Sequence, residues 1–86
     1  MDTPEFTITD LRRILRDAAG EVEPTGDILD VLWDELGYDS LALLETARRI
    51  ETEHLIRLAD TAIIDAATPR ALLDLVNEQL AADQAA

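Results

Sequence analysis

Apolar residues recur at helical spacing near the start of the chain, in a stretch bounded by polar and turn-forming residues. They recur three and four positions apart, at Leu11, Ile14, Leu15 and Ala18. This spacing places them on one face of a helix, which we expect to begin after Thr7 and to stop at Gly20. Asp10 would then lie in the first turn, where the helix dipole favours an acidic side chain.

A second helix is expected to begin at Asp39-Ser40, with the Asp39 carboxylate as its N-cap. One stripe along this helix is mostly apolar and is expected to face the core: Leu43, Ala47, Ile50 and His54. A second stripe begins apolar beside Ser40 and becomes charged further along: Leu41, Leu44, Arg48 and Glu51. A residue stripe that faces a core does not need this change from apolar to charged residues, whereas a docking surface can use both kinds of contact.

A last helix is expected from Thr68-Pro69, because threonine caps helices and proline fits their first position. Its apolar face comprises Leu72, Leu73, Val76 and Leu80, and the tail 81–86 is expected to fray. Before it, residues 60–64 form a candidate short helix that Asp60 would cap.

Segment 21–39 separates the first two long helices, and its proline, glycine and acidic residues argue against one continuous helix. It also contains apolar residues that can reach back to cover the core: Ile28, Leu29, Leu32, Trp33 and Leu36. A short helical turn around 27–33 fits this pattern. Together the elements predict an all-α fold in a single domain over residues 1–86. That fold is a small four-helix bundle of three longer helices and one short helix, with a long loop between the first and second helices.

Seven basic residues, all arginine, face nineteen acidic ones, which gives a formal net charge of -12. Such a charge repels nucleic acid and anionic membranes and attracts proteins with basic docking patches, although it also simply keeps a small domain soluble. No apolar run approaches the roughly 20 residues of a membrane span, and the acidic N-terminus is unlike a signal peptide. We therefore expect a cytoplasmic monomer with protein partners and no nucleic acid or membrane.

Ser40 is the only serine, and the chain contains no cysteine and one histidine. Without cysteine there is no disulfide framework and no thiolate nucleophile or metal ligand, and no spacing matches an EF-hand or a zinc site. At the start of a helix, unpaired N–H groups and a positive dipole would favour a phosphate attached to the serine hydroxyl. Gly37 allows an unusual backbone angle nearby, and Tyr38 adds amphipathic contact area. From Asp39-Ser40-Leu41 alone, an ordinary helix cap is the simpler interpretation of Ser40.

The segment from Trp33 to Glu45 resembles the attachment site of acyl carrier proteins. Its Gly-Tyr-Asp-Ser-Leu-Ala-Leu form is most like the carriers of bacterial type II aromatic polyketide synthases, which make antibiotics. Similarity extends to the first and last helices, in Asp10-Leu11-Arg12-Arg13 and in the run from Thr68 to Leu75, so it covers nearly the whole chain.

The resemblance implies a non-catalytic carrier. A phosphopantetheinyl transferase would move a 4'-phosphopantetheine arm from coenzyme A to Ser40, beside Asp39 and Leu41. Starter units, extender units and growing intermediates would then travel as thioesters on the thiol of the arm. That thiol suits a chain that has no cysteine of its own.

The resemblance also implies partners and contact residues. Besides the transferase, the partners would be a ketosynthase/chain-length factor, a malonyl-transferring enzyme, a ketoreductase and cyclases. By position in the family, they would contact the second helix at Leu41, Leu44, Glu45 and Glu51. Arg70 and Asn77 match polar residues that are thought to meet the oxygen-rich chain in polyketide carriers, although ordinary exposed polar residues fit these positions too.

One departure from the family follows the second helix, where this chain has no glycine: His54-Leu55-Ile56-Arg57-Leu58. Either the turn differs there or the helix runs longer, and we interpret His54 as structural. Three alternatives stay open at this point. A peptidyl carrier protein is disfavoured by Tyr38; an acidic helical interaction module without a prosthetic group would need the charge but not Ser40. An enzyme is disfavoured because the only histidine lies about four helical turns from Ser40.

Overall fold

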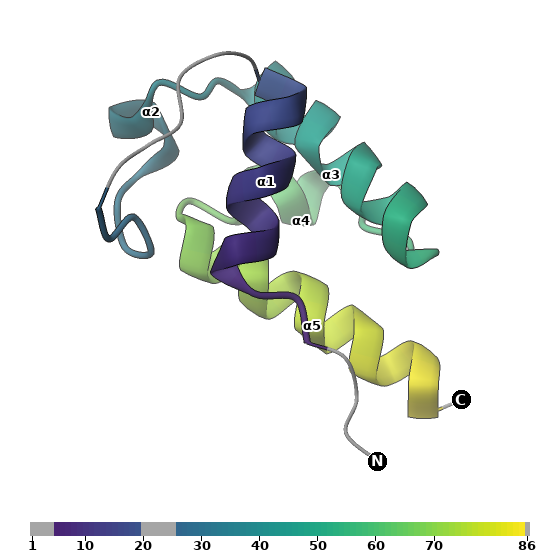
Figure 1. The fold of residues 1–86 in the computed structure, drawn as a ribbon. Coiled ribbons are helices and arrows are strands. Elements are labelled where there is room, and N and C mark those ends of the chain that lie inside the picture. Colours follow the sequence, from purple (N-terminus) through teal and green to yellow (C-terminus); the bar gives the residue numbers. More distant parts are fainter. Residues whose placement is uncertain (1–4, 20–25, 86) are drawn as a thin grey trace.

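The computed structural model describes residues 5–19 and 26–85 of the chain. Five helices lie in these ranges: α1 (Ile8–Ala19), α2 (Trp33–Leu36), α3 (Ser40–His54), α4 (Asp60–Asp65) and α5 (Pro69–Ala85). Helices α1, α3 and α5 are the long ones, and no strand occurs within the described ranges (Figure 1). The all-α bundle is thus confirmed, and α2 adds one short helix to the four that the sequence predicts.

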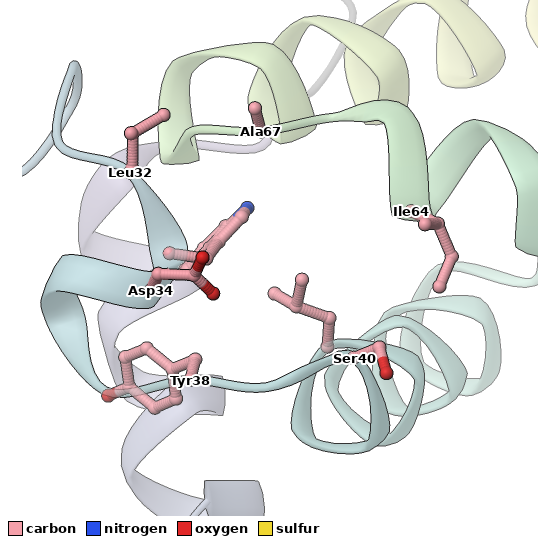
Figure 2. A pocket seen from close by; sticks show the side chains of 8 residues that line it. Leu32, Asp34, Tyr38, Ser40, Ile64 and Ala67 are labelled. Carbon is pink, nitrogen blue, oxygen red and sulfur yellow. The ribbon is translucent and has the colours of Figure 1, made fainter.

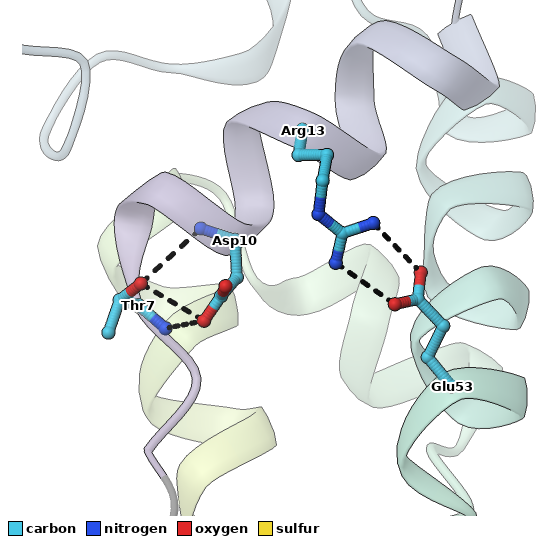
Figure 3. Close-up of polar contacts among 4 residues, drawn as sticks. All are labelled: Thr7, Asp10, Arg13 and Glu53. Carbon is cyan, nitrogen blue, oxygen red and sulfur yellow. Dashed lines mark hydrogen bonds and ion pairs between the residues drawn. The ribbon is translucent and has the colours of Figure 1, made fainter.

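Helix α1 begins where its capping residues predict. The Thr7 backbone N–H donates to Asp10 Oδ2 at 3.0 Å, and the Asp10 N–H donates to Thr7 Oγ1 at 3.3 Å (Figure 3). This reciprocal pair satisfies donors that a helix start otherwise leaves unpaired. The expected stop at Gly20 lies outside the described residues.

The core forms where α1 packs against α3, with α4 and α5 closing the bundle (Figure 1). Its buried members include most of the predicted stripes of the three long helices: Leu11, Ile14, Leu15, Leu43, Ala47, Ile50, Leu72, Val76 and Leu80. The other three predicted members, Ala18, His54 and Leu73, are half-buried. Phe6 is buried as well, and its ring meets the His54 ring edge-on with centroids 5.2 Å apart. His54 therefore has a packing contact at the end of α3.

Segment 26–39 lies against the start of α5 and is fixed there by backbone hydrogen bonds. The Arg70 N–H donates to Leu29 O at 2.9 Å, and the Trp33 N–H donates to Ala67 O at 3.2 Å. The Trp33 indole also donates, from Nε1 to Ala66 O at 2.8 Å. The helical turn expected around 27–33 is present as a single turn, in which the Val31 N–H donates to Ile28 O at 3.1 Å, and the helix of this segment is α2, at Trp33–Leu36. The bonds to Arg70 and Ala67 hold the two ends of this turn segment, Leu29 and Trp33, against α5 and the link that precedes it.

The two last helices correct two boundary predictions. Asp60 is the first residue of α4 rather than its cap, since the N-cap is Ala59 and has no side-chain hydrogen bond. Thr68 does cap α5, because its Oγ1 accepts the Ala71 N–H at 3.2 Å. Helix α5 then continues through Ala85, past the point at 81 where we expected it to fray. Alanine and glutamine favour helix, which explains the longer extent.

Helix α3 ends at His54, so the missing glycine changes the turn rather than the helix length. Leu55 takes the left-handed conformation that glycine normally supplies, with φ 56° and ψ 47°. The Ile56 N–H closes the helix end by donating to Glu51 O at 3.2 Å. The Leu55 side chain is 88% exposed. Among the described residues, no helix has the length and apolarity that crossing a membrane requires.

Candidate functional site

Ser40 is the first residue of α3 and its side chain is exposed. The preceding residue, Asp39, is extended and caps the helix, as predicted, by accepting the Ala42 N–H on Oδ1 at 2.9 Å. The Asp39 carbonyl accepts the first helical bond, from the Leu43 N–H at 3.0 Å. Asp39 therefore defines the helix start, and the Ser40 hydroxyl is not needed as its cap.

The chain enters α3 through a tight bend at Gly37, whose φ is 86°. Side chains other than glycine adopt this angle at a cost, so Gly37 suits the bend. The next residue packs inward: the Tyr38 N–H donates to Trp33 O at 3.0 Å, and the Tyr38 and Trp33 rings meet edge-on at 5.8 Å. Tyr38 is buried, whereas we expected it to offer contact area at the surface. It anchors the bend that presents Ser40.

The start of α3 offers a favourable place for an anion. Asp39 occupies the Ala42 N–H, whereas the N–H groups of Ser40 and Leu41 make no backbone hydrogen bond within the described residues. A helix of 15 residues also directs the positive end of its dipole to this point. A phosphodiester on Ser40 Oγ would thus face N–H donors, so the residues present fit a covalently attached phosphopantetheine.

A cavity of about 260 Å³ lies directly beside Ser40 (Figure 2). Its walls come from α2, α3, α4 and the link before α5: Leu32, Trp33, Asp34, Tyr38, Ser40, Leu43, Ile64 and Ala67. Most of these side chains are apolar, and Asp34 provides a carboxylate. Nothing in the sequence predicts that Ile64 and Ala67 lie near Ser40, because the apolar pattern is weak between the second and last helices.

Of the residues predicted to dock partners, three lie near Ser40 on the outer part of α3. Leu41 is 72% exposed, Glu45 is exposed and Leu44 is half-buried. Glu51 differs, since its Oε2 accepts the Leu58 N–H at 2.8 Å. Its carboxylate holds the turn after α3, a role that depends on a residue seven positions away and is invisible to helical periodicity.

Arg70 and Asn77 have internal partners and do not line the cavity at Ser40. Asn77 accepts the Phe6 N–H on Oδ1 at 2.7 Å and donates from Nδ2 to Phe6 O at 2.9 Å. Arg70 donates to both carboxylate oxygens of Asp30, at 2.7 and 3.1 Å, and this hydrogen bonding lowers the pKa of Asp30. Both residues line a different cavity of about 270 Å³, together with Leu29 and Leu73.

Side chains that could serve as metal ligands are not grouped in the described part of the chain. In ranges 5–19 and 26–85, no three histidine, cysteine or acidic side chains are grouped so that they could hold a metal ion. The single histidine packs on Phe6 at the opposite end of α3 from Ser40. Ser40 therefore lacks a histidine base, and its arrangement suits attachment of a group rather than nucleophilic turnover.

Comparisons with known proteins place these features in a family. The model of a family described as "Phosphopantetheine attachment site" matches residues 9–76. The monensin polyketide synthase acyl carrier protein of Streptomyces virginiae is 53% identical over 88 residues, which cover 100% of both chains. The granaticin polyketide synthase acyl carrier protein of Streptomyces violaceoruber is 57% identical over 75 residues, or 84% of this chain and 88% of that protein.

Solved structures show the same similarity in three dimensions. One is a solution structure of the 3,5-dioxohexyl acyl carrier protein, a triketide mimic, from the actinorhodin polyketide synthase of Streptomyces coelicolor. It matches this chain with a TM-score of 0.86 and 43% sequence identity, over 94% of this chain and 98% of that one.

Proposed function

The chain belongs to the acyl carrier proteins of type II polyketide synthases, and from that membership we propose that Ser40 is the residue that carries the 4'-phosphopantetheine arm. One observation carries the proposal: the only serine of the chain lies exposed at the first position of α3, inside the range that the family matches. We likewise propose that the chain forms one carrier domain.

The function of the protein is to carry and not to catalyse, and it interacts with the enzymes of its synthase. When attached, the arm supplies a thiol on which an acyl chain is held as a thioester. The protein supplies the rest. Ser40 Oγ would become the ester oxygen to phosphorus, losing its proton while the pyrophosphate bond of coenzyme A breaks and adenosine 3',5'-bisphosphate leaves. The first-turn N–H groups of α3 would then face the phosphate charge. Asp39 keeps the helix start in place after the hydroxyl has been used.

Partner contact is proposed for the surface next to Ser40. Exposed Leu41 and half-buried Leu44 provide a small apolar centre, and Glu45 provides a charge that basic partner residues can meet. We propose this surface for the phosphopantetheinyl transferase, the ketosynthase/chain-length factor, the malonyl-transferring enzyme, the ketoreductase and the cyclases. Glu51 is left out, because it supports the turn after α3.

The test is intact-mass spectrometry after incubation with coenzyme A and a broad-specificity transferase. We expect the wild-type chain to gain one phosphopantetheine and Ser40→Ala to gain none. Thr61→Ala is the matched control. Thr61 lies in the short helix α4 and, like Ser40, has an exposed hydroxyl, but its variant should still gain one arm.

Circular dichroism completes the test. Ser40→Ala should retain wild-type helicity, because Asp39 and not Ser40 caps α3. A folded Ser40→Ala chain that still gains the arm would refute the proposal, and so would a folded wild-type chain that gains none.

A further inference from the structure

The outward face of α3 continues well beyond Ser40 as one stripe of exposed side chains. The stripe comprises Leu41, Glu45, Arg48, Arg49 and Thr52, which recur three and four residues apart and are all exposed. A shallow groove of about 390 Å³ lies along the C-terminal part of the stripe, and its lining residues are Glu45, Arg48, Arg49, Thr52 and Glu53. This outward stripe is continuous with the surface proposed for partner contact.

The stripe changes sign along its length. Toward the Ser40 end the exposed charged residues are acids, on the approach to α3 and in its second turn: Asp34, Glu35, Asp39 and Glu45. Arg48 and Arg49 follow, so two of the seven arginines of a chain with net charge -12 lie together on this face. Arg49 is nine residues from Ser40, a distance of about 13 Å along the helix axis.

Of the two arginines in this stripe, Arg49 is the one whose charge is not paired within the described residues. Arg48 has an ion pair with Asp60 at 3.8 Å. The Glu53 carboxylate, one turn beyond Arg49, receives both terminal nitrogens of Arg13, at 2.9 and 3.4 Å (Figure 3). Arg49 itself makes no side-chain hydrogen bond or ion pair with any residue in the described ranges. An exposed guanidinium in this state is well suited to a carboxylate of another protein.

Building on the proposed function, we propose that the ketosynthase of the synthase recognises the charge polarity of this stripe, which is acidic toward Ser40 and basic at Arg49. Basic residues of the ketosynthase meet the acids near Ser40, and one of its carboxylates, about 13 Å further along, meets Arg49. Because the two ends of the stripe differ in sign, only one direction of docking satisfies both contacts, and the reversed direction opposes like charges. Arg49 therefore sets the orientation in which the arm is presented, whereas the net charge of the chain speeds the encounter.

A double charge swap separates the polarity from the net charge. Glu45→Arg with Arg49→Glu reverses the stripe and leaves the net charge at -12. The control swap is Arg57→Glu with Glu78→Arg, which reverses two exposed residues away from the stripe and also leaves -12. Each chain is loaded with the arm to completion, charged with malonyl units, and offered to the ketosynthase of its own synthase, with kcat/KM measured at low salt.

We expect the stripe swap to lower kcat/KM about tenfold, mainly through KM, because two charge contacts become repulsions. The control swap should stay within about twofold of wild type. The difference should shrink in about 0.5 M sodium chloride, where the screening length is only a few ångströms.

Equal kcat/KM for the stripe swap and the control swap would overturn the inference and leave net charge as the only electrostatic factor. Arg49→Gln against Arg57→Gln repeats the comparison with milder changes in case a swap perturbs folding, and equal values there would overturn it too. Loading is measured separately by mass spectrometry, and a wild-type chain that never gains the arm would refute the proposed function. Loaded chains with equal kcat/KM would refute only the proposed recognition of the charge polarity.

Discussion

At the scale of single residues, side chains that share one element have different tasks. Ser40 is exposed and offers its hydroxyl, while Asp39 and Gly37 define the backbone that presents it. The last helix shows the same division. Asn77 lies on a helix whose neighbouring leucines pack in the core, but its amide pairs with both backbone groups of Phe6. Asn77 thus ties the segment before α1 to α5.

Asn77→Ala should destabilise the protein because it removes both hydrogen bonds to the Phe6 backbone. Phe6 is buried, so its two backbone groups would lose their partners away from water, and we expect a loss of about 1–3 kcal/mol in the free energy of unfolding. Urea unfolding followed by circular dichroism measures it, with Glu78→Ala, an exposed neighbour, as a control that should change little. An Asn77→Ala chain as stable as the control would show that the amide is free to serve another purpose, such as contact with an acyl chain.

At the scale of elements, the turn between α3 and α4 forms without the glycine that normally supplies its left-handed residue. Leu55 occupies a left-handed conformation with its side chain 88% exposed. A residue with a Cβ pays about 1–2 kcal/mol for this conformation, and the exposed leucine side chain gains little burial in return. Two hydrogen bonds to Glu51 offset this cost, because its carbonyl accepts the Ile56 N–H and its carboxylate accepts the Leu58 N–H.

Leu55→Gly should therefore stabilise the fold, by about 0.5–1 kcal/mol after the greater freedom of glycine in the unfolded chain is counted. Leu55→Ala serves as the control, because alanine removes the exposed side chain but keeps the Cβ that causes the strain. Thermal and urea unfolding of both variants measure the difference. If Leu55→Gly proved less stable than wild type, the exposed leucine side chain would have to contribute more than its backbone angle costs.

At the scale of the whole molecule, a net charge of -12 acts on a chain of 86 residues. The ion pairs that the described residues form are exposed, and such pairs contribute little individually: Arg13–Glu53, Arg48–Asp60 and Arg70–Asp30. Repulsion among the excess acids should therefore dominate the electrostatic part of the stability.

Salt should accordingly stabilise this protein. Raising sodium chloride from about 0.02 to 0.5 M screens the repulsion, and we expect the midpoint of thermal unfolding to rise by a few degrees. Sodium sulfate is avoided in this comparison, because it strengthens hydrophobic burial as well. A midpoint that falls as sodium chloride increases would show that the ion pairs outweigh the repulsion.

The same three scales show what the sequence could predict. Helices α1, α3 and α5 were predictable because their signals are local: a stripe such as Leu11 to Leu15, the Asp39 cap, or Thr68-Pro69. The exposed position of Ser40 at the start of α3 was predictable for the same reason, since the Asp39 cap is its neighbour in the chain. The hydrogen bonds of Asn77 could not be predicted in this way, because its partner Phe6 is 71 positions away in the chain.

Long-range packing also explains the remaining differences. The placement of α2 depends on hydrogen bonds between residues far apart in the chain. Leu29 accepts from Arg70 at the start of α5, and Trp33 donates to Ala66 and Ala67 in the link before it, which are about 33 to 41 positions away. The cavity beside Ser40 needs Ile64 and Ala67 from another element. Periodicity reports which face of a helix is apolar, and it does not report which other segment will cover that face.

The most direct test of the central claim is to locate the arm on the loaded chain by tandem mass spectrometry. Trypsin cuts after Arg16 and Arg48, and the peptide 17–48 between them contains four hydroxyls: Thr25, Tyr38, Ser40 and Thr46. We expect every fragment that retains the arm to include Ser40, because Thr46 and Tyr38 are buried and the Thr46 hydroxyl bonds to Ala42 O at 2.9 Å. Finding the arm on any other residue would refute attachment at Ser40.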